Sequence, residues 1–156
     1  MKDKWVIFDL DGTLADIEDR RQLCTKENGK MDWNKFFDPE NIKLDKPNQP
    51  VIMMAQALVA FGYKIAIFSG RSASTHAATY DWLHEHGIEY NILKMRPERN
   101  FKPDEQLKLE WFTEEFVDTA PLFGREVVGV FDDRQKVVDM WREIGLTCMQ
   151  VAPGNF

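Results

Sequence analysis

The chain lacks the features of a secreted, disulfide-bonded or membrane-spanning protein. Only two of its 156 residues are cysteines, Cys24 and Cys148, and their separation matches no metal-binding spacing. We therefore expect two reduced thiols and a cytoplasmic protein. The longest apolar run, Val51–Phe61, is interrupted by Gln56 and is shorter than the roughly 20 residues that a bilayer crossing requires. The first residues show no signal-peptide pattern, so no membrane partner is expected.

The chain also lacks an excess of positive charge. It has 20 Lys plus Arg against 26 Asp plus Glu, which gives a formal net charge of −6 at pH 7. Because the overall field repels polyanions, a protein that coats nucleic-acid duplexes is excluded, and any contact with nucleic acid must come from a local basic patch. No glycine-rich loop followed by Lys and Ser or Thr is present, so no use of ATP is expected.

Strand and helix signals alternate along the chain. Short apolar runs rich in β-branched and aromatic residues predict five buried strands, at Trp5–Phe8, Lys64–Phe68, Tyr90–Leu93, Val127–Phe131 and Thr147–Val151. Segments with helical spacing lie between them, at Val51–Ala60, Ser74–His86, Pro103–Val117 and Arg134–Ile144. This alternation predicts a three-layer α/β/α, Rossmann-like fold with a five-stranded, mainly parallel sheet. Chemistry in such sheets is found at the carboxyl ends of the strands.

One segment departs from this alternation. Between Arg21 and Asn48, glycine, proline and asparagine residues interrupt the periodicity, and we interpret residues 21–48 as a small insertion after the first strand, in the manner of a cap. Residues 1–156 are otherwise expected to form a single domain. The insertion retains three aromatic residues, Trp33, Phe36 and Phe37, which form either a local core or a surface that stacks on a base.

Two pairs of acidic residues are predicted at the carboxyl ends of strands. Asp9 and Asp11 follow the first predicted strand, and Asp132 and Asp133 follow the fourth. Alternation along an extended chain turns Asp9 and Asp11 to the same side, where like charges repel unless a cation or a shared proton lies between them. A hard divalent cation is the natural partner of such carboxylates, and the spacing of Gly12 does not fit a calcium loop. We therefore expect a metal site formed by the four acidic residues.

The second predicted strand ends in a polar turn that is suited to bind an anion. Ser69 offers a hydroxyl, Gly70 offers free backbone amides, and Arg71 offers a guanidinium that binds an oxyanion in bidentate fashion. A lysine is also needed to balance the negative charge. Lys108 stands one turn after Asp104 on a predicted helix, so we expect the two side chains to pair and to direct the ammonium into the site.

The order of these motifs resembles that of the haloacid dehalogenase (HAD) superfamily of phosphohydrolases. The four motifs are matched, in chain order, by Asp9 to Thr13, by Ser69, by Lys108, and by Asp132 with Asp133. The resemblance implies the HAD version of the three-layer fold and a phosphatase that requires Mg²⁺.

The resemblance also implies a role for each motif residue. Asp9 attacks phosphorus to form an aspartyl phosphate, and Asp11 protonates the leaving oxygen and then activates water. Ser69, Lys108 and the backbone of Gly70 hold the oxygens of the transferring group. Mg²⁺ is held by the acidic residues of the first and fourth motifs, with Asp11 contributing its backbone carbonyl.

Within the superfamily, the chain looks like the 3′-phosphatase domains of T-even phage polynucleotide kinase/phosphatases. This similarity covers about residues 4–20 and 48–156 and excludes the kinase half of those enzymes. The residues in similar register, which the resemblance assigns to substrate binding together with Gly70, are Arg20, Arg71, Arg96 and Asp104.

The implied substrate is a phosphorylated nucleic-acid end or a nucleotide, and a separate kinase or ligase is left open as a partner. Two alternatives remain at this point. A phosphatase for free nucleotides or other small phosphomonoesters is favoured if residues 21–48 close over the site. A receiver-like phosphoacceptor module shares the acidic pocket, the lysine and the hydroxyl, but it lacks the second acid of the Asp9 and Asp11 pair.

Overall fold

The centre of the molecule is a five-stranded parallel sheet. A computed structural model describes residues 2–156 and orders the strands β5-β4-β1-β6-β7. Their bounds are β1 Asp3–Phe8, β4 Lys64–Ser72, β5 Ile92–Arg96, β6 Arg125–Asp132 and β7 Cys148–Gln150. All four strand pairings are parallel. Each strand therefore ends at the same edge of the sheet, and the predicted α/β class is confirmed.

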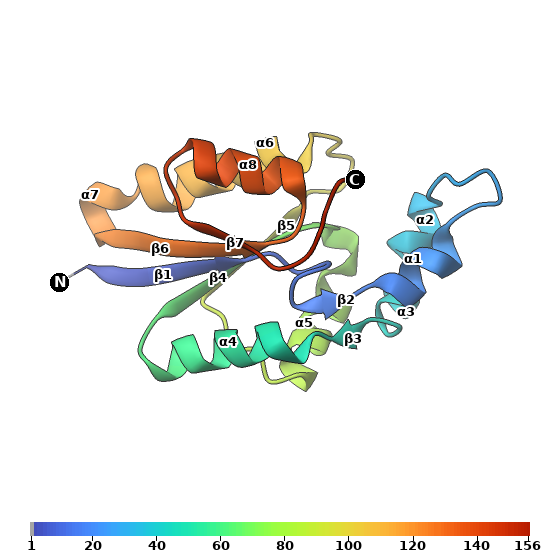
Figure 1. Cartoon of the computed structure of the whole chain (residues 1–156), viewed down its shortest axis with the longest axis horizontal. Helices are drawn as coiled ribbons and strands as arrows, with labels where there is room; N and C mark the ends of the chain where they lie inside the picture. Colours follow the sequence, from blue (N-terminus) through green and yellow to red (C-terminus); the bar gives the residue numbers. More distant parts are fainter. Residues whose placement is uncertain (1) are drawn as a thin grey trace.

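Helices cover both faces of the sheet, which gives the three predicted layers (Figure 1). One face is covered by α4 (Gln49–Ala60) and α5 (His76–Glu85). The other is covered by α6 (Asp104–Phe112), its π-helical continuation Thr113–Val117, α7 (Ala120–Phe123) and α8 (Gln135–Glu143). The four helices predicted from periodicity all form, whereas the short α7 has no counterpart in the prediction.

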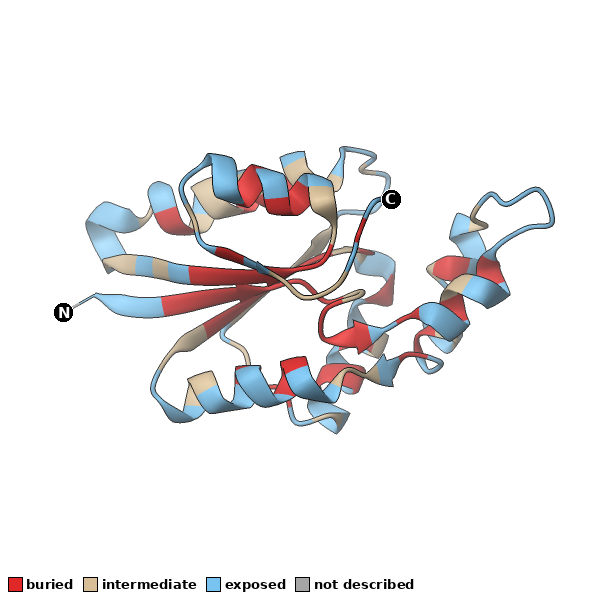
Figure 2. Ribbon diagram, in the orientation of Figure 1, coloured by how far each residue is buried: buried red, intermediate tan, exposed pale blue. Residues whose placement is uncertain are grey.

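Alternation along β1 divides the core into two clusters. Val6 and Phe8 belong to the cluster packed against α4 and α5, while Trp5 and Ile7 belong to the cluster packed against α6 and α8. Full burial of such a side chain contributes roughly 1.5–3 kcal/mol, so β1 is anchored from both sides. Figure 2 shows buried strands in the middle of the molecule and, on both sides of them, helices that have both buried and exposed residues. The first motif therefore begins at a rigid point of the fold.

The predicted insertion forms a separate lobe at the carboxyl edge of the sheet (Figure 1). A two-stranded antiparallel ribbon of β2 (Ala15–Asp16) and β3 (Lys46–Pro47) closes its base. Three short helices lie between the two strands, and they are α1 Glu18–Cys24, α2 Trp33–Phe36 and α3 Pro39–Ile42. Side chains of Asp32 and Asp38 cap α2 and α3 by accepting bonds from backbone amides.

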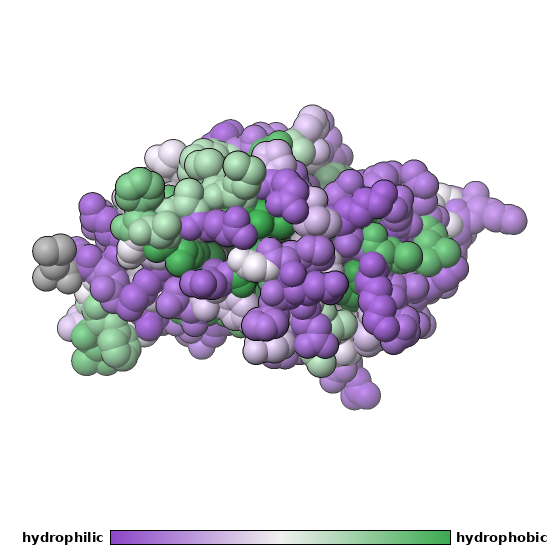
Figure 3. Space-filling model, turned by 90° about the horizontal axis from the view of Figure 1, so that it is seen from below, coloured by the Kyte–Doolittle hydropathy of each residue, from purple (hydrophilic) through white to green (hydrophobic). Residues whose placement is uncertain are grey.

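Both cysteine thiols, at Cys24 and Cys148, are free and buried. In the part of the chain that the structure describes, no helix reaches the length and hydrophobicity that a bilayer crossing demands. Seen from the side of α4, hydrophilic side chains cover much of the surface, and hydrophobic patches lie both at the end that carries the insertion and toward the opposite end (Figure 3).

Candidate active site

Asp9 stands at the carboxyl end of β1, in the middle of the sheet. Its backbone N–H donates to the carbonyl of Phe131 at 2.9 Å, which continues the strand pairing by one residue and fixes the backbone. The carboxylate is buried and accepts two side-chain hydrogen bonds, from Thr13 Oγ1 at 3.0 Å and from Lys108 Nζ at 2.7 Å. Asp9 is therefore held in one orientation at the bottom of the carboxyl edge.

Lys108 joins Asp9 to a second acidic strand end. Its ammonium, which α6 delivers, also donates to Asp132 Oδ2 at 3.0 Å. Three buried residues, Asp9, Asp132 and Asp133, each contribute one carboxylate oxygen to a cluster in which these oxygens lie within 4.8 Å of one another. Three hard oxygen donors at this spacing suit a divalent cation such as Mg²⁺. The structure thus brings the first, third and fourth motifs together.

The electrostatics of this acidic cluster favour a cation. Burial raises the pKa of Asp9 well above its ordinary value, and the Asp132 carboxylate raises it further. Burial also raises the pKa of Asp133. Burial would lower the pKa of Lys108, but the carboxylates of Asp132 and Asp9 raise it instead, so the ammonium stays charged. One lysine therefore faces three buried acids, and a divalent cation would offset the remaining repulsion.

Two glycines make room for the Asp133 carboxyl group and its backbone. Gly12 has φ of +82°, and a Cβ there would lie 2.1 Å from Asp133 Oδ2. A Cβ at Gly154 would lie 2.1 Å from the Asp133 carbonyl oxygen. Since real Cβ atoms do not approach so closely, the acidic cluster requires glycine at both positions.

Asp11 lies apart from the acidic cluster, between two arginines. Arg20 Nη2 donates to Asp11 Oδ1 at 2.9 Å, and Arg71 Nε donates to the same oxygen at 2.8 Å. Burial alone would raise the pKa of Asp11, but the guanidiniums of Arg71 and Arg20 lower it below its ordinary value. Neighbouring acids of one motif thus have opposite electrostatic surroundings.

Asp45, from the insertion, ties the two arginines together. It accepts from Arg20 Nε at 3.0 Å and from Arg71 Nη2 at 2.6 Å, and all three side chains are buried. Burial raises the pKa of Asp45 to about 7 despite the two guanidiniums, so its charge depends on both of them. Thr79 Oγ1 accepts the remaining bond of Arg71 at 3.1 Å. This buried network holds Asp11 in place and fastens the insertion to the sheet edge.

Asp104 connects two further arginines across the site. It pairs through one oxygen with Arg96 Nη2 and through the other with Arg134 Nη1, the latter at 2.7 Å. Arg96 Nε also donates to the Gly70 carbonyl at 3.0 Å. A Cβ at Gly70 would lie 2.8 Å from Asp104 Oδ1, so glycine allows this close approach.

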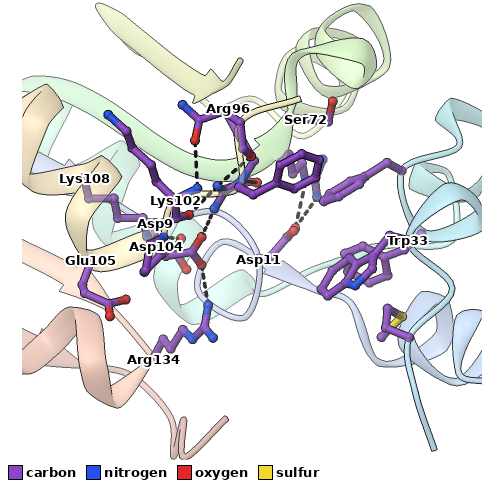
Figure 4. A pocket seen from close by; sticks show the side chains of 18 of the residues that line it. Asp9, Asp11, Trp33, Ser72, Arg96, Lys102, Asp104, Glu105, Lys108 and Arg134 are labelled. Carbon is purple, nitrogen blue, oxygen red and sulfur yellow. Dashed lines mark hydrogen bonds and ion pairs between the residues drawn. The ribbon is translucent and has the colours of Figure 1, made fainter. Parts of the chain in front are cut away.

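These groups surround one cavity of about 890 Å³ between the sheet edge and the insertion. Among the described residues that line it, eight are basic and five are acidic, although the whole chain is acidic. Figure 4 shows Asp11 between Trp33 on one side and Arg96, Asp104 and Arg134 on the other. The lining thus has an excess of positive charge, and Asp9 and Asp11 are among its five carboxylates.

A model of the family described as the phosphatase domain of polynucleotide kinase PNKP matches residues 3–156. The chain belongs to the PNKP phosphatase family. It is accordingly a phosphatase of the HAD superfamily, and this favours a hydrolase over the receiver-like alternative.

Two relatives agree with this assignment. A protein of Autographa californica nuclear polyhedrosis virus, named as a bifunctional polynucleotide kinase/RNA ligase, is 32% identical over 143 residues, which cover 89% of this chain and 18% of the viral protein. A chain of the solved Pnkp1/Rnl/Hen1 complex is 34% identical with a TM-score of 0.78, and the match covers 99% of this chain and 47% of that one. The chain thus spans less than half the length of either relative.

The fold alone is shared more widely. A haloacid dehalogenase-like hydrolase of Streptococcus pneumoniae is 13% identical with a TM-score of 0.67, and the match covers 95% of this chain and 84% of that chain. The PNKP phosphatase domain therefore carries the common HAD architecture.

The structure of this PNKP-type domain corrects the expected partner of Asp104. We expected Asp104 to pair with Lys108 one turn later, but Asp104 turns to Arg96 and Arg134, and Lys108 turns to Asp9 and Asp132. Lys108 thereby pairs with two carboxylates that are more buried than that of Asp104.

Three other predicted residues lie deeper than expected. The guanidinium of Arg71, which we expected to bind an oxyanion, is buried and bonds through all three of its nitrogens to Asp11, Thr79 and Asp45. The Arg20 side chain has 0% exposure and bonds to protein groups through all three of its nitrogens. Ser69 is 1% exposed, and its hydroxyl accepts from the Arg71 backbone N–H at 3.2 Å. Within residues 2–156, the cavity lining includes Gly70 and Arg71 but neither Arg20 nor Ser69. The strand β4 also continues to Ser72, beyond the turn predicted after Phe68.

Sequence reasoning missed two residues of this PNKP-type site. Asp45 lies in the irregular insertion, and no local pattern distinguishes it from the exposed acids around it. Arg134 follows the fourth motif directly, and its position beside two acids was the available signal for a role at the site.

Proposed function

We propose that the chain is a Mg²⁺-dependent phosphomonoesterase that removes terminal 3′-phosphates from nucleic-acid ends through an aspartyl-phosphate intermediate. One observation carries this proposal. Asp9 and Asp11 stand one residue apart, yet Asp9 lies in the acidic cluster with Lys108 and Asp11 lies between Arg20 and Arg71. Carboxylates kept in such different surroundings suit the separate roles of nucleophile and acid–base catalyst.

In the first step, an oxygen of Asp9 forms a bond to phosphorus while the bond from phosphorus to the leaving oxygen breaks. Asp11 gives its proton to that oxygen, which leaves as the alcohol. The arginines keep Asp11 ionised in the free protein, so it must first take up a proton. A phosphate dianion bound beside Asp11 raises the pKa of Asp11 by like-charge repulsion, so Asp11 takes up this proton when substrate is present.

In the second step, Asp11 acts as a base. It accepts a proton from a water molecule whose oxygen attacks phosphorus, and the bond between phosphorus and Asp9 breaks to release inorganic phosphate. The guanidiniums of Arg20 and Arg71 suit this step, because they stabilise the ionised form of Asp11. They act by holding Asp11, and in this proposal Arg20 contacts no substrate.

The remaining polar groups hold the transferring oxygens. Lys108 offers its ammonium and Gly70 its backbone amide, while the buried Ser69 precedes Gly70 in the chain and accepts from the Arg71 backbone N–H. The residues that would hold Mg²⁺ are Asp9, Asp132 and Asp133 through carboxylates and Asp11 through its carbonyl. When bound, the cation supplies charge that screens the phosphate from the acids around it.

The family and the lining of the cavity support a nucleic-acid end as substrate. Five of the basic residues that line the cavity suit a few backbone phosphates, and they are Arg96, Arg99, Lys102, Arg134 and Lys136. The relatives are named for polynucleotide kinase, ligase and RNA repair components, so we propose that a separate kinase or ligase works beside this phosphatase. Two free, buried thiols are compatible with the cytoplasm as its compartment.

The test is phosphate release in the presence of Mg²⁺ from matched oligonucleotides with a 3′- or a 5′-phosphate and from free 3′- and 5′-nucleotides. We expect preferential release from the 3′-phosphorylated oligonucleotide and none with the Asp9→Asn variant. Release only from free nucleotides would replace the proposal with the alternative of a nucleotide phosphatase, for which residues 21–48 would serve as a closed cap.

A further inference from the structure

The structure assigns to Trp33 a role in substrate recognition: we propose that its indole stacks on the unpaired base at the phosphorylated end, which makes single-stranded ends the preferred substrate class. This inference rests on the proposed function and deepens it. Trp33 begins α2 in the insertion and lines the same cavity as Asp9 and Asp11.

The exposure of Trp33 distinguishes it from the other tryptophans. Its residue is 60% exposed, whereas Trp5, Trp82, Trp111 and Trp141 are each at most 7% exposed. A large aromatic ring left in contact with water inside a ligand-sized cavity is typical of a recognition surface. A residue of a local core would be covered instead.

Two phenylalanine rings of the insertion pack against the indole. The ring of Phe37 is stacked at 5.7 Å and 22°, and the ring of Phe36 meets Trp33 edge to face at 5.6 Å and 86°. Phe36 is buried, and the Arg20 guanidinium lies 4.2 Å from its ring centroid. Rigid aromatic platforms bind with little loss of conformational entropy, so Trp33 is suited to a flat partner.

Arg20 connects the aromatic cluster of Trp33, Phe36 and Phe37 to Asp11. Arg20 donates to the Phe36 carbonyl at 3.3 Å and to Asp11 at 2.9 Å. Arg20 therefore fixes both the aromatic cluster on which the base would stack and the carboxylate beside which the phosphate would bind. In Figure 4 the indole faces Asp11 from the side opposite Arg96 and Arg134.

Charge identifies the occupant as a nucleotide rather than an apolar ligand. Arg21 from the insertion and Arg99 and Lys102 from the opposite wall line the cavity, and Phe101 between them is 92% exposed. Aromatic faces interleaved with basic groups are the surface that single-stranded nucleic acids bind. A base paired in a duplex brings the complementary strand with it, whereas an unpaired base can present its face to Trp33 alone.

The experiment compares three substrates: a single-stranded oligonucleotide with a 3′-phosphate, the same strand with an abasic 3′-terminal residue, and glycerol 2-phosphate. We expect Trp33→Ala to lower kcat/KM for the first about 5- to 150-fold, chiefly through KM, because one stacked base contributes that much affinity. The other two substrates should lose little, and Trp33→Tyr should restore most of the activity. Leu23→Ala, at an exposed position elsewhere in the insertion, is the matched control. An equal loss on the abasic strand would overturn the inference.

A binding measurement separates this inference from the proposed function. In Asp9→Asn, Trp33 is the most exposed tryptophan, so we expect iodide to quench its fluorescence and an oligonucleotide to protect it. In Trp33→Tyr the quenching itself should disappear, which identifies Trp33 as its source. Binding without protection would overturn the stacking role whatever the enzyme hydrolyses. Protection without phosphate release by the wild-type chain would leave the stacking role standing and refute the phosphatase.

Discussion

The ammonium of Lys108 lies 2.7 Å from the carboxylate of Asp9, although 99 residues separate them in the chain. We predict that Lys108→Met, which keeps the apolar stem and removes the charge, lowers kcat/KM at least about 10²-fold. The loss should be similar for an oligonucleotide and for glycerol 2-phosphate, because the lysine acts at phosphorus. The control is Lys64→Met, which removes a surface pair with Asp3. Unchanged turnover in Lys108→Met would refute the assignment.

Arg20 is predicted to act on the acid–base catalyst rather than on the nucleic acid. Arg20→Ala leaves Arg71 as the one arginine paired with Asp11 and with the buried Asp45. We therefore expect the free energy of unfolding to fall by about 3 kcal/mol. Displacement of Asp11 should cost about 10²-fold in kcat for glycerol 2-phosphate and oligonucleotide alike. Urea unfolding and phosphate release measure the two effects.

The adjacent arginine is the matched control for this prediction. Arg21 lines the cavity, and its guanidinium lies 4.8 Å from the Phe156 ring centroid. Arg21→Ala should therefore leave turnover of glycerol 2-phosphate intact. If Arg20→Ala harmed only the oligonucleotide reaction, Arg20 would have to contact the substrate after all.

Gly12 is predicted to be required by the metal site as well as by the backbone. Gly12→Ala costs about 1–2 kcal/mol from its positive φ, and its Cβ also pushes the Asp133 carboxylate away. Gly62 has φ of +90° with nothing within 4 Å of a built Cβ, so Gly62→Ala isolates the backbone cost. Calorimetric titration with Mg²⁺ should show weaker binding in Gly12→Ala than in Gly62→Ala. Equal affinities would mean that Asp133 takes no part in the site.

Mg²⁺ is predicted to stabilise the fold, because it relieves repulsion among buried acids. At tenfold excess over its Kd the stabilisation should reach about 1.4 kcal/mol, seen as a rise in Tm that EDTA reverses. Asp132→Asn should lose this rise, while Asp19→Asn, at an exposed pair with Lys46, should keep it. A rise of equal size in both variants would place the cation elsewhere.

The fold and the acidic cluster could be predicted because their signals are local. Buried strands are short apolar runs, and Asp9 and Asp132 directly follow such runs, so the parallel topology alone brings them to one edge. The expected pairing of Asp104 with Lys108 was also local, and it was wrong because partners from other strands and helices compete for both side chains.

Asp45 could not be predicted because its partners are distant in the chain. Arg20 and Arg71 stand 25 and 26 residues away, on either side of it, and the stretch from Arg20 to Asp45 has no regular period. Only the folded insertion shows that this acid is buried.

The bonds from Arg20 to Asp11, Asp45 and the Phe36 carbonyl restrict how the insertion can diverge among relatives. A graft that exchanges residues 17–45, between β2 and β3, for a lobe of another specificity would also remove the guanidinium that holds Asp11. A transplanted lobe should therefore keep activity only if it carries both Arg20 and Asp45, so we expect changes of specificity at α2, which carries Trp33, rather than at the base of the lobe.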